Sequence, residues 1–387
     1  MTGSAPPSPA AAQHAPVFTS DVFTSGVGGA HTYRLPSLLA TRRGALLLFA
    51  HGRLASARDV GASAVFLSTS LDGGKTWTAA RRVLSDPSNR TMIAQQAVLD
   101  QRSGRVFLLA NQVPCSRCHG LRAALRRRPC GPCTTFVMSS DDEGRSWSEA
   151  VALPGESTLG SGVTSGVTLR RGRHAGRLLA ARRADCCDCA GSPQSYTLLS
   201  DDRGRTWRAG GRLPVGWTES AIAELPNGSV LLTARALRGR AARLGGRRLF
   251  ARSDDAGETW ARTWGFSGGG GEGGLRDPDC AASMISAEQG PRLWFANPAH
   301  ATRRCNLSLH ASDDGGARWQ LAHVIHPGRS AYSDMALTPS GDLAIAFERG
   351  NHRFISVTVL PRPALASKEQ DSDLRGNAAN TATKFRR

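Results

Sequence analysis

Short apolar runs rich in Val, Leu, Ala and Phe recur along the whole chain, and Gly, Pro and short polar residues separate them. Runs of this length bounded by turn residues indicate β-strands. No long stretch has the apolar spacing of an amphipathic helix. The pattern therefore predicts an all-β protein.

Six pairs of apolar runs flank a short turn and so predict six β-hairpins. In the clearest pair, residues 219–225 and 229–235 lie on either side of Pro226-Asn227-Gly228. A second pair, residues 331–337 and 342–348, flanks Pro339-Ser340-Gly341. The other four turns are at residues 42–44, 101–104, 171–176 and 287–290. The small apolar residues of these runs suit the inner strands of a sheet.

A polar phrase of the form Ser-x-Asp-x-Gly-x-Ser/Thr-Trp occurs five times, which indicates a repeat architecture. The copies are residues 70–77, 140–147, 200–207, 253–260 and 312–319, and the last has Arg318 in place of Ser or Thr. Each copy suits a tight turn. The Asp can accept hydrogen bonds from turn amides, the Gly can adopt positive φ, and the Trp can pack against the neighbouring repeat.

The first five hairpins are each followed by a third strand, the repeat turn and a fourth strand, which is the order of a four-stranded blade. Six such units predict a six-bladed β-propeller. The sixth unit has a third strand at residues 354–360 but no fourth, and we expect residues 16–25 to supply it. The propeller domain then covers residues 16–360, and we expect the polar segments 1–15 and 361–387 to be disordered.

The hairpin turns and the repeat turns are expected at one end of each blade, so the far ends of the inner strands should gather on the opposite face. In two hairpins the outermost polar residues are each eight positions from the middle of the turn, which places them opposite each other. In a third hairpin the two polar residues are almost equally far from the turn. The residues so placed are Arg34 with Arg53, Glu219 with Arg235, and Tyr332 with Glu348.

Tyr33-Arg34-Leu35-Pro36 resembles the Arg-Pro signature of the exo-α-sialidases, and the five repeats resemble the Asp boxes of that family. The resemblance runs from about residue 30 to residue 360. It is closest to the lysosomal-type branch, whose later segments resemble residues 295–300, 304–307 and 327–333. It implies a glycoside hydrolase that removes terminal α-linked sialic acids from glycoproteins, glycolipids or oligosaccharides with retention of configuration.

The resemblance also implies a role for each site residue. The substrate-binding residues would be Arg34, Arg235 and Arg304, which clamp the sugar carboxylate, Glu348, which holds the first arginine, and Arg53. The catalytic residues would be Tyr332 as nucleophile, Glu219 as its base and Asp59 as general acid and base. A planar guanidinium suits a carboxylate because it donates two parallel hydrogen bonds. A neutral Tyr avoids the repulsion that a carboxylate nucleophile would meet beside the carboxylate of the sugar. This chemistry needs no cofactor and no metal.

Three positions depart from the family pattern. They affect the expected substrate preference and not the class of reaction. His51 stands where the family often has an acid, and Gln95 and Gln96 are expected in a loop that shapes the sugar pocket. Two other functions stay open. One is a non-catalytic propeller that binds glycans or proteins, and the other is a hydrolase or transferase of a related 2-keto sugar acid.

Two Cys-x-x-Cys pairs, Cys115 with Cys118 and Cys130 with Cys133, have the spacing of a zinc ribbon. Three further cysteines lie at positions 186, 187 and 189. A structural zinc, disulfides and free thiols are all compatible with this pattern. Analysis of the metal content of the purified protein separates the first state from the others.

The formal net charge of +18 comes almost entirely from arginine, since Lys75, Lys368 and Lys384 are the only lysines among 49 basic residues. The arginines are scattered, so we expect sialylated glycans and no nucleic acid as partners, although the charge can attract anionic substrates. No apolar run approaches the length of a membrane span. Residues 1–15 lack the apolar middle of a signal peptide, while the resemblance implies a lysosomal or secretory protein, so the compartment stays open.

Overall fold

The computed structural model describes residues 18–59, 61–86, 92–113, 134–154, 162–184, 194–236, 248–265 and 275–365. These residues form antiparallel strands and two short 3-10 helices, η1 (Gly172–His174) and η2 (Arg362–Leu365). Within these ranges no helix is long and apolar enough to cross a membrane. The prediction of an all-β fold is confirmed.

The strands of the described ranges form four sheets of four strands and one sheet of seven. The first sheet contains β2 (Thr32–Ala40), β3 (Leu46–Arg53), β4 (Ser63–Ser70) and β5 (Arg81–Ser85). The second contains β6 (Met92–Leu99), β7 (Val106–Val113), β8 (Thr134–Ser140) and β9 (Val151–Ala152). The third contains β10 (Val167–Thr168), β11 (Leu178–Ala184), β12 (Gln194–Ser200) and β13 (Arg208–Arg212). The fourth contains β14 (Trp217–Glu224), β15 (Val230–Ala236), β16 (Leu249–Ser253) and β17 (Arg262–Gly265). The large sheet contains β18 (Ser283–Ser286), β19 (Leu293–Pro298), β20 (Cys305–Ser312), β21 (Gln320–Leu337), β22 (Leu343–Arg349), β23 (Phe354–Leu360) and β1 (Phe18–Thr24).

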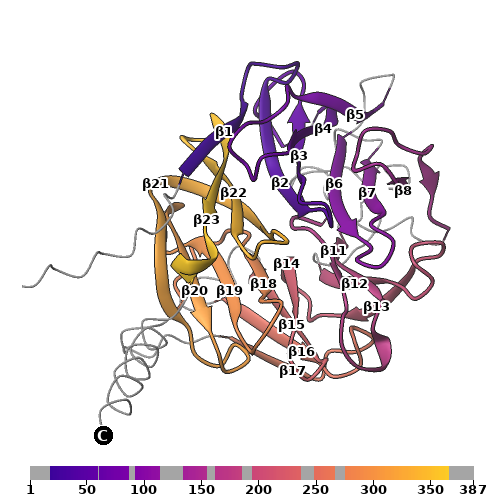
Figure 1. Ribbon diagram of the computed structural model, residues 1–387, viewed down its shortest axis with the longest axis vertical. Helices are drawn as coiled ribbons and strands as arrows, with labels where there is room; N and C mark the ends of the chain where they lie inside the picture. The colour runs from indigo at the N-terminus through magenta and orange to yellow at the C-terminus, as the bar shows by residue number, and fades with distance from the viewer. Residues whose placement is uncertain are drawn as a thin grey trace, which may run out of the picture.

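The sheets stand around a common centre in a propeller-like arrangement (Figure 1). Their inner strands contact one another in a closed order, in which β2 contacts β6, β6 contacts β10, β10 contacts β14, β14 contacts β18, β18 contacts β21, and β21 contacts β2. Each of these strands pairs with the next one along the chain, so all six predicted hairpins are confirmed.

The large sheet consists of two runs of strands that share β21. Residues 320–329 of this strand pair with β20, and residues 330–337 pair with β22. The sequence suggested two separate strands here, one after the last repeat turn and one before Pro339. Because the backbone continues from one to the other, the two runs are joined into a single sheet.

The N-terminal strand pairs with the C-terminal part of the chain, as predicted. Strand β1 runs antiparallel to β23, with Phe18 opposite Val359 and Thr24 opposite Phe354. A bidentate ion pair between Asp21 and Arg349 adds to this pairing. Beyond β23 the chain continues into η2, so the described structure extends to residue 365, past the predicted domain boundary at residue 360. The expected disorder of residues 1–15 falls outside the described residues, as does that of the chain after residue 365.

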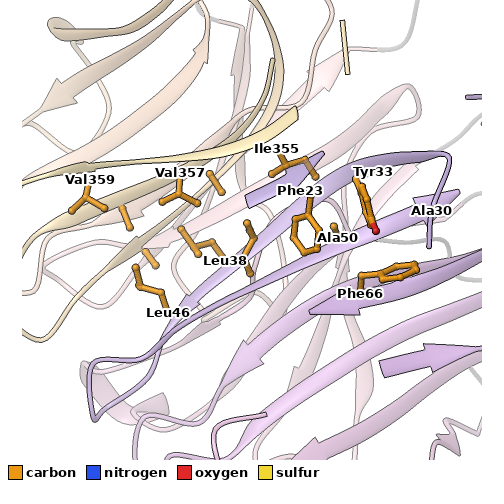
Figure 2. Packing of buried hydrophobic residues seen from close by; sticks show 14 of the residues in the cluster. Phe23, Ala30, Tyr33, Leu38, Leu46, Ala50, Phe66, Ile355, Val357 and Val359 are labelled. Carbon is orange, nitrogen blue, oxygen red and sulfur yellow. The ribbon is translucent and has the colours of Figure 1, made fainter. Parts of the chain in front are cut away.

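Hydrophobic side chains fill the spaces between neighbouring sheets. Figure 2 shows the cluster between the first sheet and the β1–β23 side of the large sheet, where Tyr33 lies between Phe23 and Phe66. Its ring centroid is 4.8 Å from that of Phe23 and 5.2 Å from that of Phe66. Full burial of a large apolar side chain contributes about 1.5–3 kcal/mol. The buried face of β1 therefore stabilises the closure of the ring as well as its own sheet.

The repeat turns share one set of hydrogen bonds. In the second copy the Ser140 hydroxyl donates to Asp142 (2.8 Å) and accepts from the amide of Gly144 (2.8 Å). Asp142 accepts from both the amide and the hydroxyl of Ser146 (2.9 and 2.6 Å). These bonds, first of all the one from the Ser146 hydroxyl, lower the pKa of Asp142 to about 2. The turn is therefore held by a carboxylate that stays ionised at any ordinary pH.

The tryptophan of each turn packs against the neighbouring part of the structure, as expected. The ring of Trp147 meets Phe49 of β3 edge-on at 5.8 Å, and that of Trp207 meets Phe107 of β7 edge-on at 5.9 Å. Trp260 donates its indole N–H to the carbonyl of Gly211 in the preceding sheet (3.2 Å). Each turn thus ties its own sheet to the one before it.

The repeat glycine of the third turn leaves no room for a side chain. Gly204 has φ +79°, and a Cβ there would lie 2.2 Å from the ring of Phe107. We expect Gly204→Ala to lower the free energy of unfolding by at least about 2 kcal/mol, because strain and overpacking add. Arg203 in the same turn already has φ +62°, so Arg203→Ala should change it by less than about 0.5 kcal/mol. Urea unfolding measures the free energy of unfolding of both variants. Equal losses in the two would contradict the steric requirement for glycine at position 204.

Candidate active site

The predicted site residues lie at the end of the ring away from the repeat turns. The turn of the first hairpin meets the second repeat turn, where Thr41 donates to Glu143 (2.6 Å), so hairpin turns and repeat turns do share one end. Arg34 and Glu219 lie near the starts of β2 and β14, and Glu348 lies near the end of β22. The structure therefore brings these residues together on the opposite face.

Tyr332 lies at the centre of this group and is buried. Its hydroxyl donates to Glu219 Oε1 (2.5 Å) and accepts from Arg235 Nη1 (3.1 Å). The guanidinium carbons of Arg34 and Arg304 lie 5.4 and 5.6 Å from the centre of its ring. Burial, and then the negative charge of Glu219, raise the pKa of Tyr332 well above its ordinary value. The phenol is therefore neutral and points its proton at a carboxylate.

Glu219 is buried but remains an anion. Burial alone would raise its pKa, but the positive charges of Arg235 and Arg183 outweigh burial and hold the pKa below its usual value. Arg235 Nη1 donates to Glu219 Oε2 at 2.5 Å, and Arg183 Nη1 lies 3.4 Å from Oε1. Glu219 occupies an irregularity in the β14–β15 pairing and has φ +42°. This local distortion turns its side chain toward Tyr332.

Arg34 forms a buried ion pair with Glu348. Its Nε donates to Glu348 Oε1 at 2.7 Å, and the amide of Leu35 donates to the same oxygen at 2.8 Å. Burial opposes ionisation of both side chains, but their mutual attraction raises the pKa of Arg34 and lowers that of Glu348. Because Arg34 is on β2 and Glu348 on β22, the pair connects the first sheet with the large one.

Arg53 and Asp59 form the most exposed part of the group. Arg53 Nη2 donates to Asp59 Oδ1 at 2.5 Å, and the side chain of Asp59 is 83% exposed. Arg53 itself is buried, and burial and the nearby Arg34 lower its pKa. The sequence arithmetic placed Arg53 opposite Arg34, but β3 pairs Arg53 with Thr32, and His51 lies opposite Arg34. The irregularity between Arg34 and Ser37 accounts for one residue of this offset, since the register nearer the turn would place Gly52 opposite Arg34. The rest arises because Arg34 and Arg53 are not evenly spaced from the turn.

Asp279 holds Arg235 and Arg304, two of the three arginines predicted to bind the sugar carboxylate, and the sequence interpretation missed it. Its carboxylate accepts from Arg235 Nε at 2.6 Å, and its carbonyl accepts from Arg304 Nη2 at 2.7 Å. Asp279 has φ +61° in a loop that a buried ion pair between Arg248 and Asp277 anchors (2.9 Å). The available signal was the acidic loop 277–279, just before an inner strand at the site end of the ring.

Asp334, two residues after Tyr332 in β21, connects several inner strands. One of its carboxylate oxygens accepts from the amide of Leu38 (2.8 Å) and from the amide and hydroxyl of Ser165 (2.9 and 2.7 Å). Burial raises its pKa to about 6 although these hydrogen bonds oppose the shift. The bonds connect β2, the segment before β10 and β21 beside the site.

The three departures from the family pattern lie in strands. Gln95 and Gln96 are buried in β6, so their expected place in a loop was wrong. The side-chain amide of Gln95 donates to the carbonyl of Leu35 (2.8 Å), which connects β6 to the arginine signature. His51 is buried, and burial followed by the charges of Arg53 and Arg34 lowers its pKa to about 3. It is therefore a neutral imidazole beside two cations.

The cysteines of the zinc hypothesis, Cys115, Cys118, Cys130 and Cys133, fall outside the described residues, as do Cys186, Cys187 and Cys189. Among the residues that the structure describes, no group of three or more His, Cys, Asp or Glu side chains could hold a metal ion. Cys280 and Cys305 are free thiols.

The structure is a propeller-like fold with a buried Tyr–Glu pair among arginines. Its sequence identifies the family. The chain belongs to the family of BNR repeat-like domains, which it matches over residues 44–345.

Sialidases are among its relatives. It is 30% identical to a sialidase of Micromonospora viridifaciens over 361 residues, which are 87% of this chain and 53% of the relative. Human Sialidase-4 is 33% identical over 201 residues, which are 47% of this chain and 40% of that protein. The chain thus spans about half the length of these curated relatives. The solved structure of the Hadza microbial sialidase Hz136 superimposes with a TM-score of 0.74 and 26% identity, covering 89% of this chain and 69% of that one.

The pair Arg34–Glu348 should contribute strongly to stability because both groups are buried. Glu348→Gln leaves the Arg34 charge without its partner, so we expect the free energy of unfolding to fall by about 3 kcal/mol or more. Asp141→Asn breaks the exposed pair with Arg105 and should cost less than about 1 kcal/mol. Denaturant unfolding followed by tryptophan fluorescence compares the two, and equal losses would contradict a stabilising role for the buried pair.

Proposed function

We propose that the protein is a retaining exo-α-sialidase, which hydrolyses terminal α-linked sialic acids from glycoproteins, glycolipids or oligosaccharides. The observation that carries the proposal is the 2.5 Å hydrogen bond between buried Tyr332 and ionised Glu219, beside three arginines. The names of the relatives support the same substrate class.

In the proposed complex Arg34, Arg235 and Arg304 bind the carboxylate of the sugar. The guanidinium groups of Arg34 and Arg304 lie over the aromatic ring of Tyr332. Arg235 donates a hydrogen bond to the hydroxyl of Tyr332. A carboxylate held among them brings the neighbouring anomeric carbon close to the phenol oxygen. This positioning replaces a search in solution with a single bound geometry, which lowers the entropic part of the barrier.

In the first proposed step the Tyr332 oxygen attacks the anomeric carbon as its proton passes to Glu219. The bond from that carbon to the glycosidic oxygen breaks, and Asp59 donates a proton to the leaving oxygen. The product is a sugar bound covalently to Tyr332. Asp59 is exposed and paired with Arg53 in the free protein, and substrate that covers it removes water and favours the protonated acid.

In the second proposed step a water molecule attacks the same carbon and passes a proton to Asp59. The bond to Tyr332 breaks, and the phenolate recovers its proton from Glu219. Two displacements at one carbon give net retention. The site is then restored, and the free sialic acid carries its original configuration.

Two other functions remain to be tested against this one. A non-catalytic glycan-binding propeller would need the arginines, but it would have no use for a buried phenol paired with an ionised carboxylate. A hydrolase or transferase of a related 2-keto sugar acid would use the same carboxylate clamp. Release of sugar from a panel of sialosides and deaminated sialosides separates these cases.

The finer points of the sequence interpretation belong to this proposal as well. We regard the seven-stranded sheet as two blades that share β21, which makes six blades in all, and the five repeat turns as Asp boxes. The closed order of inner strands supports that count. The lysosomal-type branch stays a prediction, to which the partial match with human Sialidase-4 adds only modest support.

Removal of the phenol hydroxyl tests the proposed nucleophile. We expect Tyr332→Phe to lower kcat for a fluorogenic sialoside by at least about 10³-fold, because no covalent intermediate can form. Tyr196→Phe removes a buried tyrosine hydroxyl on β12, outside the site, and should keep full activity. Circular dichroism checks that both variants fold. Normal turnover by Tyr332→Phe would refute the nucleophile assignment.

The leaving group tests the proposed acid. A methylumbelliferyl group leaves as a stable phenolate and needs little protonation, whereas a sugar alkoxide needs a proton. We therefore expect Asp59→Ala to lower kcat/KM for 3′-sialyllactose at least about 100-fold, and for the aryl sialoside by a smaller factor. Equal losses on both substrates would mean that Asp59 does not protonate the leaving oxygen.

A further inference from the structure

A cavity opens beside the arginines of the candidate active site, on the side of β20, β21 and the turn between β22 and β23. Its volume is about 340 Å³, at the small end of the range for ligand sites. Arg304 and Glu348 belong both to its wall and to the candidate active site. Its lining also includes Arg303, Arg329, Ser330, Arg349, Asn351 and His352, and we call it the arginine pocket.

Within the described part of the chain, three arginines of this pocket, Arg303, Arg304 and Arg329, form no ion pair with an acid. Arg303 contacts the imidazole of His300 (3.3 Å), Arg329 donates to the side-chain carbonyl of Asn351 (3.0 Å), and Arg304 donates to a backbone carbonyl. No carboxylate of the described chain lies within 4.0 Å of these three guanidiniums. Arg349 at the edge of the pocket differs, because Asp21 holds it in a bidentate ion pair. The pocket therefore presents a net positive wall.

Two further observations indicate a built site and not only scattered surface arginines. Gly350, Asn351 and His352 have φ of +60°, +60° and +68°, so the turn that forms one wall holds two non-glycine residues in a strained conformation. Such strain gathers at ligand sites. The hydroxyl of Ser330, which also lines the pocket, is buried and has no hydrogen-bond partner among the described residues. A buried hydroxyl normally has one.

His352 adds little charge at neutral pH. It lies 3.7 Å from Glu348, but burial and the positive charge of Arg34 lower the pKa of its imidazole. The negative charge of Glu348 is already compensated by Arg34. The field in the pocket is thus set by the guanidiniums, which suit a planar or tetrahedral anion with several oxygens.

We propose that the arginine pocket is a second anion subsite, which binds a carboxylate or sulfate on the sugar next to the terminal sialic acid. The inference rests on the proposed function, since the shared Arg304 wall places the pocket beside the sugar in the first site. The enzyme then prefers glycans that carry two neighbouring negative charges. The anion is either the carboxylate of an inner sialic acid or a sulfate ester.

Initial rates on matched substrates test the subsite. The substrates are 3′-sialyllactose, its disialylated form and its form sulfated on the galactose. We expect kcat/KM of the natural enzyme to be at least about tenfold higher for one of the anionic substrates, because hydrogen bonds between charged groups are strong. The substrate that gains identifies the source of the anion, and the gain should shrink as salt concentration rises.

The double variant Arg303→Gln with Arg329→Gln assigns the effect to the pocket. Both side chains are exposed, so the fold should be kept, and kcat/KM for plain sialyllactose should stay within about twofold. The preference for the anionic substrate should fall to about twofold or less. Arg353→Gln removes an exposed arginine of the same turn that is outside the pocket, and it should leave the preference intact.

Equal kcat/KM for neutral and anionic substrates in the natural enzyme would overturn the subsite, as would a preference that survives in the double variant. Failure to cleave any sialoside would refute the proposed function instead. In that case calorimetric titration with the three oligosaccharides still decides the subsite. Tighter binding of an anionic one, lost in the double variant, supports it, and equal binding overturns it.

Discussion

Four arginines meet at one end of the inner strands, and their mutual repulsion is the constraint on which the site depends. A guanidinium cannot lose its charge in a protein, so a group of them at one place needs acids and carbonyl oxygens as partners. The observed partners are Glu348 for Arg34, Asp59 for Arg53, Glu219 and Asp279 for Arg235, and the carbonyl of Asp279 for Arg304. These partners come from different sheets and loops. Holding the arginines therefore also fixes how the strands of the first, fourth and large sheets meet at the centre.

The three hairpins that supply the site are irregular at the site end. The pairing shifts between Arg34 and Ser37 in β2, between Thr218 and Ser220 in β14, and between Ser330 and Ser333 in β21. An extra residue in one strand re-aims the side chains beside it, and such bulges are common next to active sites. In a regular antiparallel pair, successive side chains point to opposite faces. The irregularities let neighbouring positions contribute to one cluster while the rest of each strand keeps its buried face in the core.

Much of this arrangement could be predicted from the sequence, because repeats and turns count strands reliably. Equal spacing from a turn predicted Glu219 opposite Arg235, and the two side chains do meet, although the bulge at Glu219 puts Thr218 opposite Arg235. The strand predicted before Thr24 pairs with β23 as expected. Spacing could not reveal the bulge that puts His51 opposite Arg34, since a bulge leaves no periodic mark. The acidic loop 277–279 marked Asp279 as a candidate, but its contact with Arg304 could not be predicted, because a backbone carbonyl in a left-handed conformation makes it. Gln95 and Gln96 were expected in a loop because the family resemblance placed them beside the sugar pocket, whereas both are buried in β6.

The opposite pKa shifts of Tyr332 and Glu219 follow from this geometry and limit how the proposed nucleophile can work. Arg235, which we propose binds the substrate carboxylate, and Arg183 lower the pKa of Glu219, and burial beside that anion raises the pKa of Tyr332. In the free protein the proton therefore stays on the phenol, and no phenolate waits for substrate. Transfer becomes favourable only as the new bond to carbon takes up the developing charge. Arg235 contacts both groups, so a carboxylate drawn to it reduces the positive field at Glu219 and makes that group a stronger base at the moment of attack.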